Sequence, residues 1–593
     1  MTTYYVCCVS GSDQSNGSES TPFQTIQAGA NVAKPGDTIL VQPGIYRERV
    51  SPVRGGSSAS LAITFRSVVP QKAIIRGSVP WIPEPICDTL VIKDIYSGPL
   101  DLQVFQDSSA IDGANPFLVP CCVTPHGREG RPESVSGIKG ADPRMVYSLG
   151  QVFADDRPLL QCPYKTEMEQ TPDSWWYDIS ANRLYTHIPG GFDNIEITNQ
   201  RRVFAPHSRG LRYIVVDGFV IERCGNQYPN KFWTVAQNQQ AGMIGTRSGR
   251  FWTIQNNIIQ HAAGVGIDWG NEGGAAQDLE YPAVKGGTNG QASGSYGHVI
   301  KDNILCDNGA AGTASFMGKC FVFSGNVVER NNAWRYYGKQ RWESAGVKVH
   351  TPTGATITKN VIRNNYCHGI WSDQGAGVGS YFSANVITGN EGNGVNFEIG
   401  TGTSGKVLNN IFDANEYNIS FVTSGGCLVA HNLFLGSHKG DIETVAFTRP
   451  DKWDSLNIEV YYNLFMNSAT YMKLSASSAI ASRFLNYNQY GADGRFIFCP
   501  DTKIAVKKNL DDWRKSWENE AANYDEASVV QSGSSGSFSE GRLTLDVSFV
   551  SMPFISRTDI IGDYSGTVWT AENCVAGPFC GGIYINKDKE TSI

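Results

Sequence analysis

The stretch that decides the fold is NVIRNNYCHGIWSDQGAGVGSYFSANVI, residues 360–387, which begins and ends with the triplet Asn-Val-Ile. An Asn followed by two apolar residues recurs through the middle of the chain, and several copies lie 22 to 25 residues apart. A period of this length, built from short β-rich units, is typical of a solenoid. The Leu framework of leucine-rich repeats is missing, so the sequence predicts an all-β chain with a parallel β-helix. The triplets begin at Asn257, Asn303, Asn326, Asn360, Asn385, Asn410, Asn432 and Asn463.

The recurring Asn predicts the corners of this coil. Equivalent residues of successive turns stack at the spacing of parallel strands, ~4.8 Å. Asn tolerates a left-handed φ, and its side chain can hydrogen-bond along a stack. We therefore expect each repeated Asn to occupy a corner and the apolar pair after it to begin a strand.

Four regions follow from this pattern. Residues 1–80 predict an N-terminal cap and the first turns of the coil. Residues 81–205 lose the Asn triplet and carry Pro clusters, which predicts an inserted antiparallel β-sandwich domain. Residues 206–480 predict the main coil with the catalytic face, and residues 481–593 predict its C-terminal end and an extension.

Two shorter predictions concern the ends of the coil. The segment PFQTIQAGANVAK, residues 22–34, has apolar residues at helical spacing and predicts a short helix that covers the open end. The Ser/Gly-rich run QSGSSGSFSEG, residues 531–541, predicts a flexible loop.

Composition and charge narrow the classes of partner. The 593 residues include 64 Gly, only 18% are charged, and the net charge is −7. A nucleic-acid binder usually carries a basic face, so we expect no nucleic-acid partner. No run approaches the ~18 consecutive apolar residues of a membrane span, so we expect no membrane partner either. A neutral or uncharged partner fits better, and a homo-oligomer stays open.

The start of the chain and the cysteines bear on the compartment. The first residues alternate like a strand and lack a basic start and a cleavage site, so we expect a cytoplasmic protein, or a secreted one if a leader precedes this chain. The 14 Cys lack metal-site spacing such as paired CxxC, so we expect no metal. Buried free thiols are the main expectation, with Cys574 and Cys580 the pair that suits a disulfide best.

Two neighbouring segments carry a carboxylate in the same slot. GIWSDQGAG, residues 369–377, contains Asp373, and NGVNFEIG, residues 393–400, contains Glu398. Both acids follow the Asn of their own turn by the same number of residues, so the coil should stack them. His350 of the segment GVKVH holds the same position one turn earlier. The sequence therefore predicts a column of His350, Asp373 and Glu398.

Strand alternation sorts the side chains of these turns onto two faces. One set should point into the coil and is apolar except for Ser372. The other set should point outward and form a polar face with one large aromatic residue. The inward set is Val347, Val349, Ile370, Ser372, Val395 and Phe397, and the outward set is Lys348, His350, Trp371, Asp373, Asn396 and Glu398.

Stacked carboxylates suit one reaction in particular. Acids one turn apart lie ~5 Å apart, the separation used in retaining glycoside hydrolysis, where one attacks the sugar and the other protonates the leaving oxygen. Like charges at this distance also raise the pKa of one member of the pair. The alternative is a pair of solvated surface acids, and a Ca²⁺ site lacks the D-x-D-x-D-G loop. Trp371 is either a sugar platform or a packing residue, and His350 and Lys348 could bind hydroxyls.

At these residues the chain resembles glycoside hydrolase family 120, the β-xylosidase family. The resemblance covers residues 4 to about 435 and includes ESAGVKVH, GIWSDQGAG and VNFEIG. It implies a right-handed parallel β-helix interrupted by a β-sandwich, β-xylosidase activity with retention, and no cofactor. Position by position, it implies that Asp373 is the nucleophile, Glu398 the general acid/base, and Glu343 and His350 further substrate-site residues. The family has His where this chain has Trp342, a departure that leaves the sugar open.

Three alternative functions stay open at this point. A different β-helix glycosidase, such as an α-L-fucosidase-like enzyme, would use a similar acidic pair. A polysaccharide lyase or epimerase shares the scaffold and would use a basic residue such as Lys348 on an acidic substrate. A non-catalytic sugar-binding protein would use the same face without chemistry.

Overall fold

The protein is described by a computed structural model, which forms two compact units: Met1–Phe316 with Asn331–Ser344, and Met317–Arg330 with Ala345–Ile593. The described residues are 1–86, 93–105, 114–119, 148–226, 242–271, 295–335, 343–374, 377–400, 405–445, 458–475, 484–499, 505–516, 525–539, 542–555, 557, 560 and 562–580.

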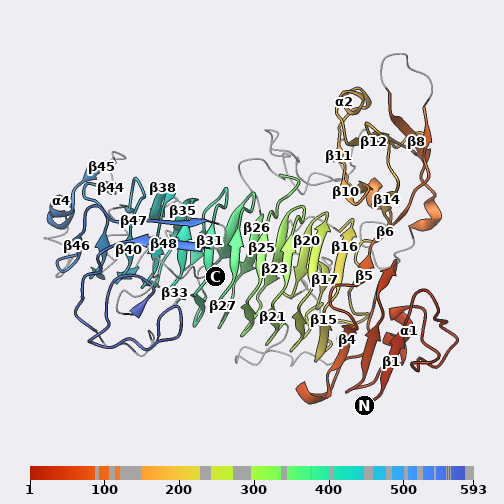
Figure 1. The fold of residues 1–593 in the computed structure, drawn as a ribbon, viewed down its shortest axis with the longest axis horizontal. Helices are drawn as coiled ribbons and strands as arrows, with labels where there is room; N and C mark the ends of the chain where they lie inside the picture. The colour runs from red at the N-terminus through yellow and green to blue at the C-terminus, as the bar shows by residue number, and fades with distance from the viewer. Residues whose placement is uncertain are drawn as a thin grey trace. The chain divides into compact units, whose positions relative to one another are not determined.

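The first unit contains the early turns of a parallel β-helix, whose strands lie side by side in three sheets (Figure 1). The first sheet orders β1 (Thr3–Val6), β2 (Thr38–Val41), β4 (Ile63–Ser67), β15 (Ile214–Asp217), β18 (Thr253–Gln255) and β21 (Val299–Lys301). The second orders β3 (Gly44–Tyr46), β5 (Ala73–Arg76), β16 (Val220–Cys224), β19 (Ile258–Ala262) and β22 (Ile304–Cys306). The third orders β17 (Gly242–Gly245), β20 (Val265–Asp268) and β23 (Ala311–Phe316).

The second unit repeats the same three-sheet plan. One sheet orders β24 (Val322–Ser324), β27 (Thr356–Thr358), β30 (Tyr381–Ser383), β33 (Gly405–Leu408), β36 (Cys427–Ala430), β39 (Glu459–Tyr461) and β42 (Phe484–Asn486). Another orders β25 (Val327–Glu329), β28 (Val361–Arg363), β31 (Val386–Thr388), β34 (Ile411–Asp413), β37 (Leu433–Phe434), β40 (Leu464–Phe465), β43 (Gln489–Tyr490) and β46 (Val529–Val530). The sheet that bears the predicted site orders β26 (Ala345–His350), β29 (His368–Asp373), β32 (Val395–Gly400), β35 (Asn415–Ser424), β38 (Ser437–Val445), β41 (Met472–Ser475), β44 (Phe496–Cys499) and β45 (Val506–Lys508).

The interior of the coil consists of stacked apolar side chains. Phe397 stacks on Phe421 of the next turn with ring centroids 5.3 Å apart, and Phe412 stacks on Phe434 at 5.2 Å. Because strands pair in register, like residues lie over like residues and each turn adds a layer without widening the core. The predicted parallel β-helix is confirmed.

Of the two predictions about the corners, one is confirmed and one is wrong. The repeated Asn side chains do hydrogen-bond along the stack: Nδ2 of Asn360 donates to Oδ1 of Asn385 at 2.9 Å, and Asn385 donates to Asn410 at 3.0 Å. The left-handed φ, however, belongs to the residue before each Asn, such as Lys359 (57°) and Ala384 (53°). The prediction that Asn itself supplies the left-handed corner is therefore wrong, because its side chain, and not its backbone, is what the corner uses.

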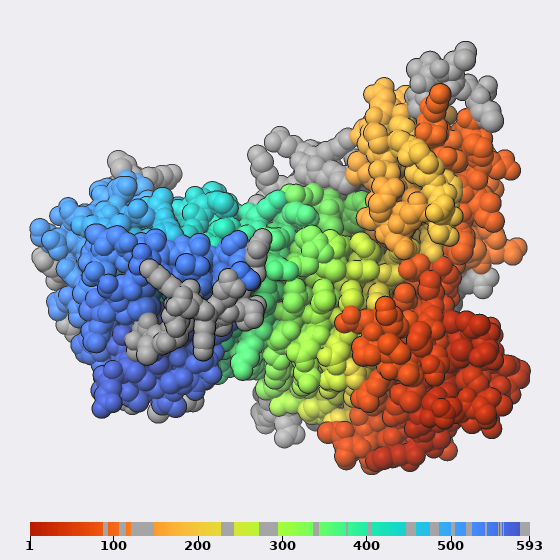
Figure 2. All heavy atoms as spheres, in the orientation of Figure 1, coloured from red at the N-terminus to blue at the C-terminus, as the bar shows by residue number. Residues whose placement is uncertain are grey.

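An inserted β-sandwich interrupts the early turns, as the fold class predicted, and Figure 2 shows it as a lobe in orange and yellow. Its two sheets bury a shared core that includes Val152, Trp175, Leu184 and Ile197. Helix α2 (Lys165–Gln170) connects two strands of the second sheet. The first sheet orders β10 (Arg157–Pro158), β9 (Val152–Ala154), β14 (Ile195–Thr198) and β6 (Ser78–Pro80), and the second orders β11 (Leu160–Gln161), β12 (Ser174–Asp178), β13 (Arg183–His187), β8 (Ile95–Pro99) and β7 (Glu84–Pro85).

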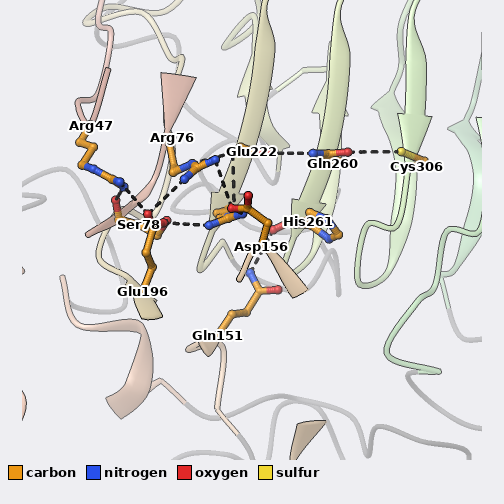
Figure 3. A network of polar contacts seen from close by, with 11 residues as sticks. Arg47, Arg76, Ser78, Gln151, Asp156, Glu196, Glu222, Gln260, His261 and Cys306 are labelled. Atoms are coloured by element: carbon orange, nitrogen blue, oxygen red, sulfur yellow. Dashed lines mark hydrogen bonds and ion pairs between the residues drawn. The ribbon is translucent and has the colours of Figure 1, made fainter. Parts of the chain in front are cut away.

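A buried ion network ties the sandwich to the coil (Figure 3). Glu196 of sandwich strand β14 accepts bonds from Arg47 at 2.6 Å, Arg76 at 3.1 Å and Arg223 at 2.8 Å. Arg76 also donates to Glu222 of coil strand β16 at 2.6 Å. Burial raises the pKa of Glu196, but the hydrogen bonds and positive charges around it outweigh burial and lower the pKa to about 2.

The ends of the chain show one confirmed and one wrong prediction. Helix α1 (Ile26–Val32) forms within the predicted segment, and the Thr25 side chain caps it. The run expected as a loop instead contains β47 (Ser535–Ser539), which pairs antiparallel with β48 (Arg542–Asp546). The alternating partly buried residues of this run suffice for a hairpin. Helix α4 (Leu510–Lys515) precedes it.

Cysteine chemistry and membrane spans can be read from the described residues. Cys574 and Cys580 are free thiols, so the pair favoured for a disulfide is not bonded. None of the described helices is long and apolar enough to cross a membrane. The described residues also contain no group of three or more His, Cys, Asp and Glu side chains that could hold a metal ion.

Candidate active site

Three consecutive strands align the predicted column. His350 on β26 pairs in register with Asp373 on β29, and Asp373 pairs with Glu398 on β32. Directly paired residues of parallel neighbours lie about 4.8 Å apart and point to the same side of the sheet. The column predicted from the repeat spacing is therefore present in the structure.

The inward and outward faces differ less in burial than the sequence suggested. The inward residues Val347, Ile370 and Phe397 are fully buried, as expected. On the outward side, however, Asp373 is only 7% exposed, and Lys348 is not exposed at all. The alternative of a solvated pair of surface acids is therefore wrong for Asp373. Alternation tells which side a residue faces but not whether that side is covered.

Asp373 lies in a positively charged surrounding. Its Oδ2 accepts a hydrogen bond from Lys348 Nζ at 3.2 Å and lies 3.6 Å from His350 Nε2. Its Oδ1 accepts from the backbone N–H of Gln374 at 2.9 Å. Burial raises the pKa of this carboxyl, but the Lys348 charge and the hydrogen bonds outweigh burial and lower it. Asp373 is thus an ionised carboxylate at neutral pH, as a nucleophile requires.

His350 is a neutral member of the column. Burial, helped by the Lys348 charge, lowers its pKa to about 4, although Asp373 opposes this shift. Its Nδ1 lies 3.0 Å from the Thr351 hydroxyl. At pH 7 a neutral His350 can offer a hydrogen bond but adds no charge to the site.

Trp371 packs against the same lysine. Lys348 Nζ lies 3.5 Å from the centre of the indole ring, and the ring of His368 meets it edge-on at 5.3 Å. One face of the indole is thus used by a cation–π contact, a role that the sequence did not indicate. The buried indole N–H has no hydrogen-bond partner among the described residues.

Three predicted site residues remain: Glu398, Glu343 and Trp342. Glu398 is half-buried on β32, so one carboxylate of the pair is more open than the other. Glu343 is buried with a φ of 58° and belongs to the other compact unit, so its substrate role stays a prediction. Trp342 lies outside the described residues.

Comparisons with known proteins identify the fold. A family model described as "Right handed beta helix region" matches residues 241–434. A model described as "Protein of unknown function (DUF1565)" matches residues 9–52. A search of curated proteins finds no match. The chain has a right-handed parallel β-helix.

Solved structures extend this likeness to nearly the whole chain. The structure described as "The complex structure of XylC with xylose" aligns with 97% of this chain and 98% of its own, at a TM-score of 0.70 and 19% identity. A GH136 lacto-N-biosidase from Eubacterium ramulus covers 77% of this chain and 68% of its own, at a TM-score of 0.40 and 14% identity. The mannuronan C-5 epimerase A-module of Azotobacter vinelandii covers 89% and 99%, at 0.41 and 11%. The likeness to the first structure, at 19% identity, shows the fold alone, so the reaction must be argued from the site.

Proposed function

We propose that the protein is a retaining glycoside hydrolase that cleaves β-xylosidic bonds of xylo-oligosaccharides or a related glycoside. The observation that carries the proposal is the register pairing of Asp373 with Glu398 on adjacent parallel strands. This pairing gives the short carboxylate separation of a double displacement, whereas the inverting reaction needs a gap wide enough for water.

The two acids would act in turn. Asp373, kept ionised by Lys348, attacks the anomeric carbon while Glu398 protonates the departing oxygen. The bond from the sugar to the leaving group breaks as the bond to Asp373 forms. Glu398 then takes a proton from water, and the resulting attack on the anomeric carbon releases the sugar and regenerates Asp373. The chemistry uses no cofactor.

The surroundings of Lys348 favour this proposal over a lyase or epimerase. A lysine that removes a proton must be neutral and must reach the substrate. Lys348 is fully buried and donates to Asp373 at 3.2 Å, so its nitrogen is directed at the carboxylate. A role in setting the charge of Asp373 suits it better.

Two observations favour xylose as the sugar. The motifs that resemble glycoside hydrolase family 120, and the likeness to a structure described with bound xylose, both point to this sugar. The residue at position 342, Trp in place of the family's His, leaves room for another neutral sugar. A panel of sugars is therefore part of the test.

Azide rescue tests the proposed roles. Wild type is assayed on p-nitrophenyl glycosides, with β-xyloside among them, beside Asp373→Ala and Glu398→Ala with sodium azide added. We expect Asp373→Ala to yield a glycosyl azide of inverted configuration and Glu398→Ala one of retained configuration. Full activity of both variants without azide would contradict the proposal, and an inactive wild type would overturn the choice of substrate.

A further inference from the structure

A second polar cluster lies on the same sheet as the carboxylate pair. It consists of Tyr417 and Ser420 on β35, Glu443 on β38 and Lys473 on β41. Ser420 Oγ donates to Glu443 Oε1 at 2.8 Å, and Lys473 Nζ lies 3.6 Å from Glu443 Oε2 and 3.5 Å from the Tyr417 hydroxyl. The sequence pattern did not indicate this cluster, because its residues lie on later turns than Asp373 and Glu398.

The strand register places this cluster on the outward face of the proposed active site. Trp371 pairs with Asn396, and Asn396 pairs with Ser420. Ser420 pairs with Glu443, which pairs with Lys473. Paired residues of parallel strands share a side of the sheet, so one outward row joins the site to the cluster.

The row also gives the separation between the cluster and the carboxylate pair. Glu443 lies about 12 Å along the coil axis and about 7 Å along the strand from the middle of the carboxylate pair, using parallel-strand spacing and rise. This is longer than one sugar ring. The cluster therefore faces a position beyond the sugar that adjoins the cleaved bond.

The contacts within the cluster leave bonding capacity for a ligand. The contacts of the Lys473 ammonium with the Tyr417 hydroxyl and with Glu443 are at the long limit for a hydrogen bond, and it lies 5.7 Å from the centre of the Tyr417 ring. About a third of the Lys473 side chain is exposed. Glu443, by contrast, is 7% exposed and holds a carboxylate beside that ammonium. A donor, an acceptor and an aromatic ring at one place match the hydroxyls and the apolar face of a sugar.

We propose that Tyr417, Glu443 and Lys473 form a distal subsite for a further neutral sugar residue of an oligosaccharide bound at Asp373 and Glu398. This inference rests on the proposed function and adds a preference for longer chains. The carboxylate beside the ammonium balances its charge, which suits neutral hydroxyls better than the carboxylate of a uronic acid.

Binding by chain length tests the subsite without needing turnover. Affinities of xylose, xylobiose, xylotriose and xylotetraose are measured by calorimetry in a Glu398→Gln background, alone and combined with Lys473→Met or Tyr417→Phe. In the Glu398→Gln background we expect affinity to rise with the length of the ligand. Adding Lys473→Met or Tyr417→Phe should weaken binding of the longest ligands about tenfold, because one hydrogen bond between the subsite and the distal sugar is lost. The affinity for xylose should stay unchanged.

The chain offers a matched control. Lys406 Nζ donates to the Tyr381 hydroxyl at 2.8 Å on strands of a different sheet, so Lys406→Met and Tyr381→Phe remove the same chemistry elsewhere. These controls should not alter length dependence. A rise with length that survives Lys473→Met and Tyr417→Phe would overturn the subsite and leave the proposed function standing, as would affinity that does not rise with length. Failure of every xylo-oligosaccharide to bind would overturn the choice of xylose in the proposed function and the subsite together.

Discussion

At the scale of single residues, Lys348 explains how Asp373 can be buried and charged. A fully buried ammonium is unstable alone, and a buried carboxylate is unstable alone, but each stabilises the other at 3.2 Å. The repeat spacing was enough to predict that Lys348, Trp371 and Asp373 share a face. It was not enough to predict the cation–π contact, because pairing in register brings Lys348 and Trp371 side by side but does not fix how each side chain turns.

The first prediction concerns Lys348→Met. Without the ammonium, burial is opposed only by weaker contacts, so the pKa of Asp373 rises and the acid limb of kcat/KM moves to higher pH. We expect a loss of activity that is larger at pH 5 than at pH 8, measured on whichever glycoside wild type cleaves. Lys406→Met serves as the control. An acid limb that stays in place would show that Lys348 does not set the charge of Asp373.

A second prediction uses a buried histidine away from the site. Burial lowers the pKa of His431 to about 3, and its ring stacks on Trp569 at 3.9 Å. Below pH 6.5 the unfolded chain takes up a proton that the folded chain refuses, so the free energy of unfolding falls as pH drops from about 6.5 to about 3. In urea unfolding, the slope of the free energy of unfolding against pH should be smaller in His431→Phe than in wild type, by the amount that corresponds to about one proton. The same change at exposed His438 should have no such effect, and equal slopes for both variants would contradict the assignment.

At the scale of elements, the corners show what a sequence repeat can and cannot reveal. The Asn triplets predicted one ladder of hydrogen-bonded Asn side chains. A second ladder runs through Asn365, Asn390 and Asn415, which lie outside the triplets. The left-handed residues vary among Lys, Ala, Asn and His, so no residue type marks them. What forces the conformation there is the turn of the backbone, which leaves no signal in composition.

The third prediction tests this ladder with Asn385→Ala. The Asn385 side chain accepts from both the backbone N–H and the Nδ2 of Asn360, and it donates to the carbonyl of Ile357. Its removal leaves buried donors unpaired, so we expect a loss of about 2 to 3 kcal/mol in the free energy of unfolding. Chemical denaturation measures this loss. The half-buried Ser383→Ala should cost well under half as much, and equal costs would deny the ladder a special role.

At the scale of the whole molecule, a β-sandwich is inserted into a coil whose turns otherwise follow one another. The break in the Asn pattern was visible in the sequence, which is why the insertion could be predicted. The ion network that connects the sandwich to the coil could not be predicted, since Glu196 lies 149 residues from Arg47 and 120 from Arg76. Such partners meet only when strands distant in sequence are folded together.

The fourth prediction concerns Glu196→Gln. Three arginine side chains lose their shared carboxylate, and breaking one member of a buried pair costs about 3 to 5 kcal/mol. We expect faster backbone hydrogen exchange in the sandwich strands β9 and β14, measured by mass spectrometry, with little change in the coil of the second unit. In wild type the same loosening should begin as pH falls below about 4.5, because the pKa of Glu196 is lowered and its charge is then lost only in acid. An equal increase in hydrogen exchange across the whole chain would contradict a local stabilisation of the sandwich by this ion network.

The central claim is that Asp373 becomes covalently bonded to the sugar. Incubation with a 2-deoxy-2-fluoro xyloside that carries a good leaving group should slow breakdown of the intermediate, so that the mass of one sugar remains on the protein. Peptide mass spectrometry then locates it. The account predicts a label on the peptide that contains Asp373, and none on Asp373→Ala. A label on another carboxylate, or hydrolysis with inverted configuration, would contradict it.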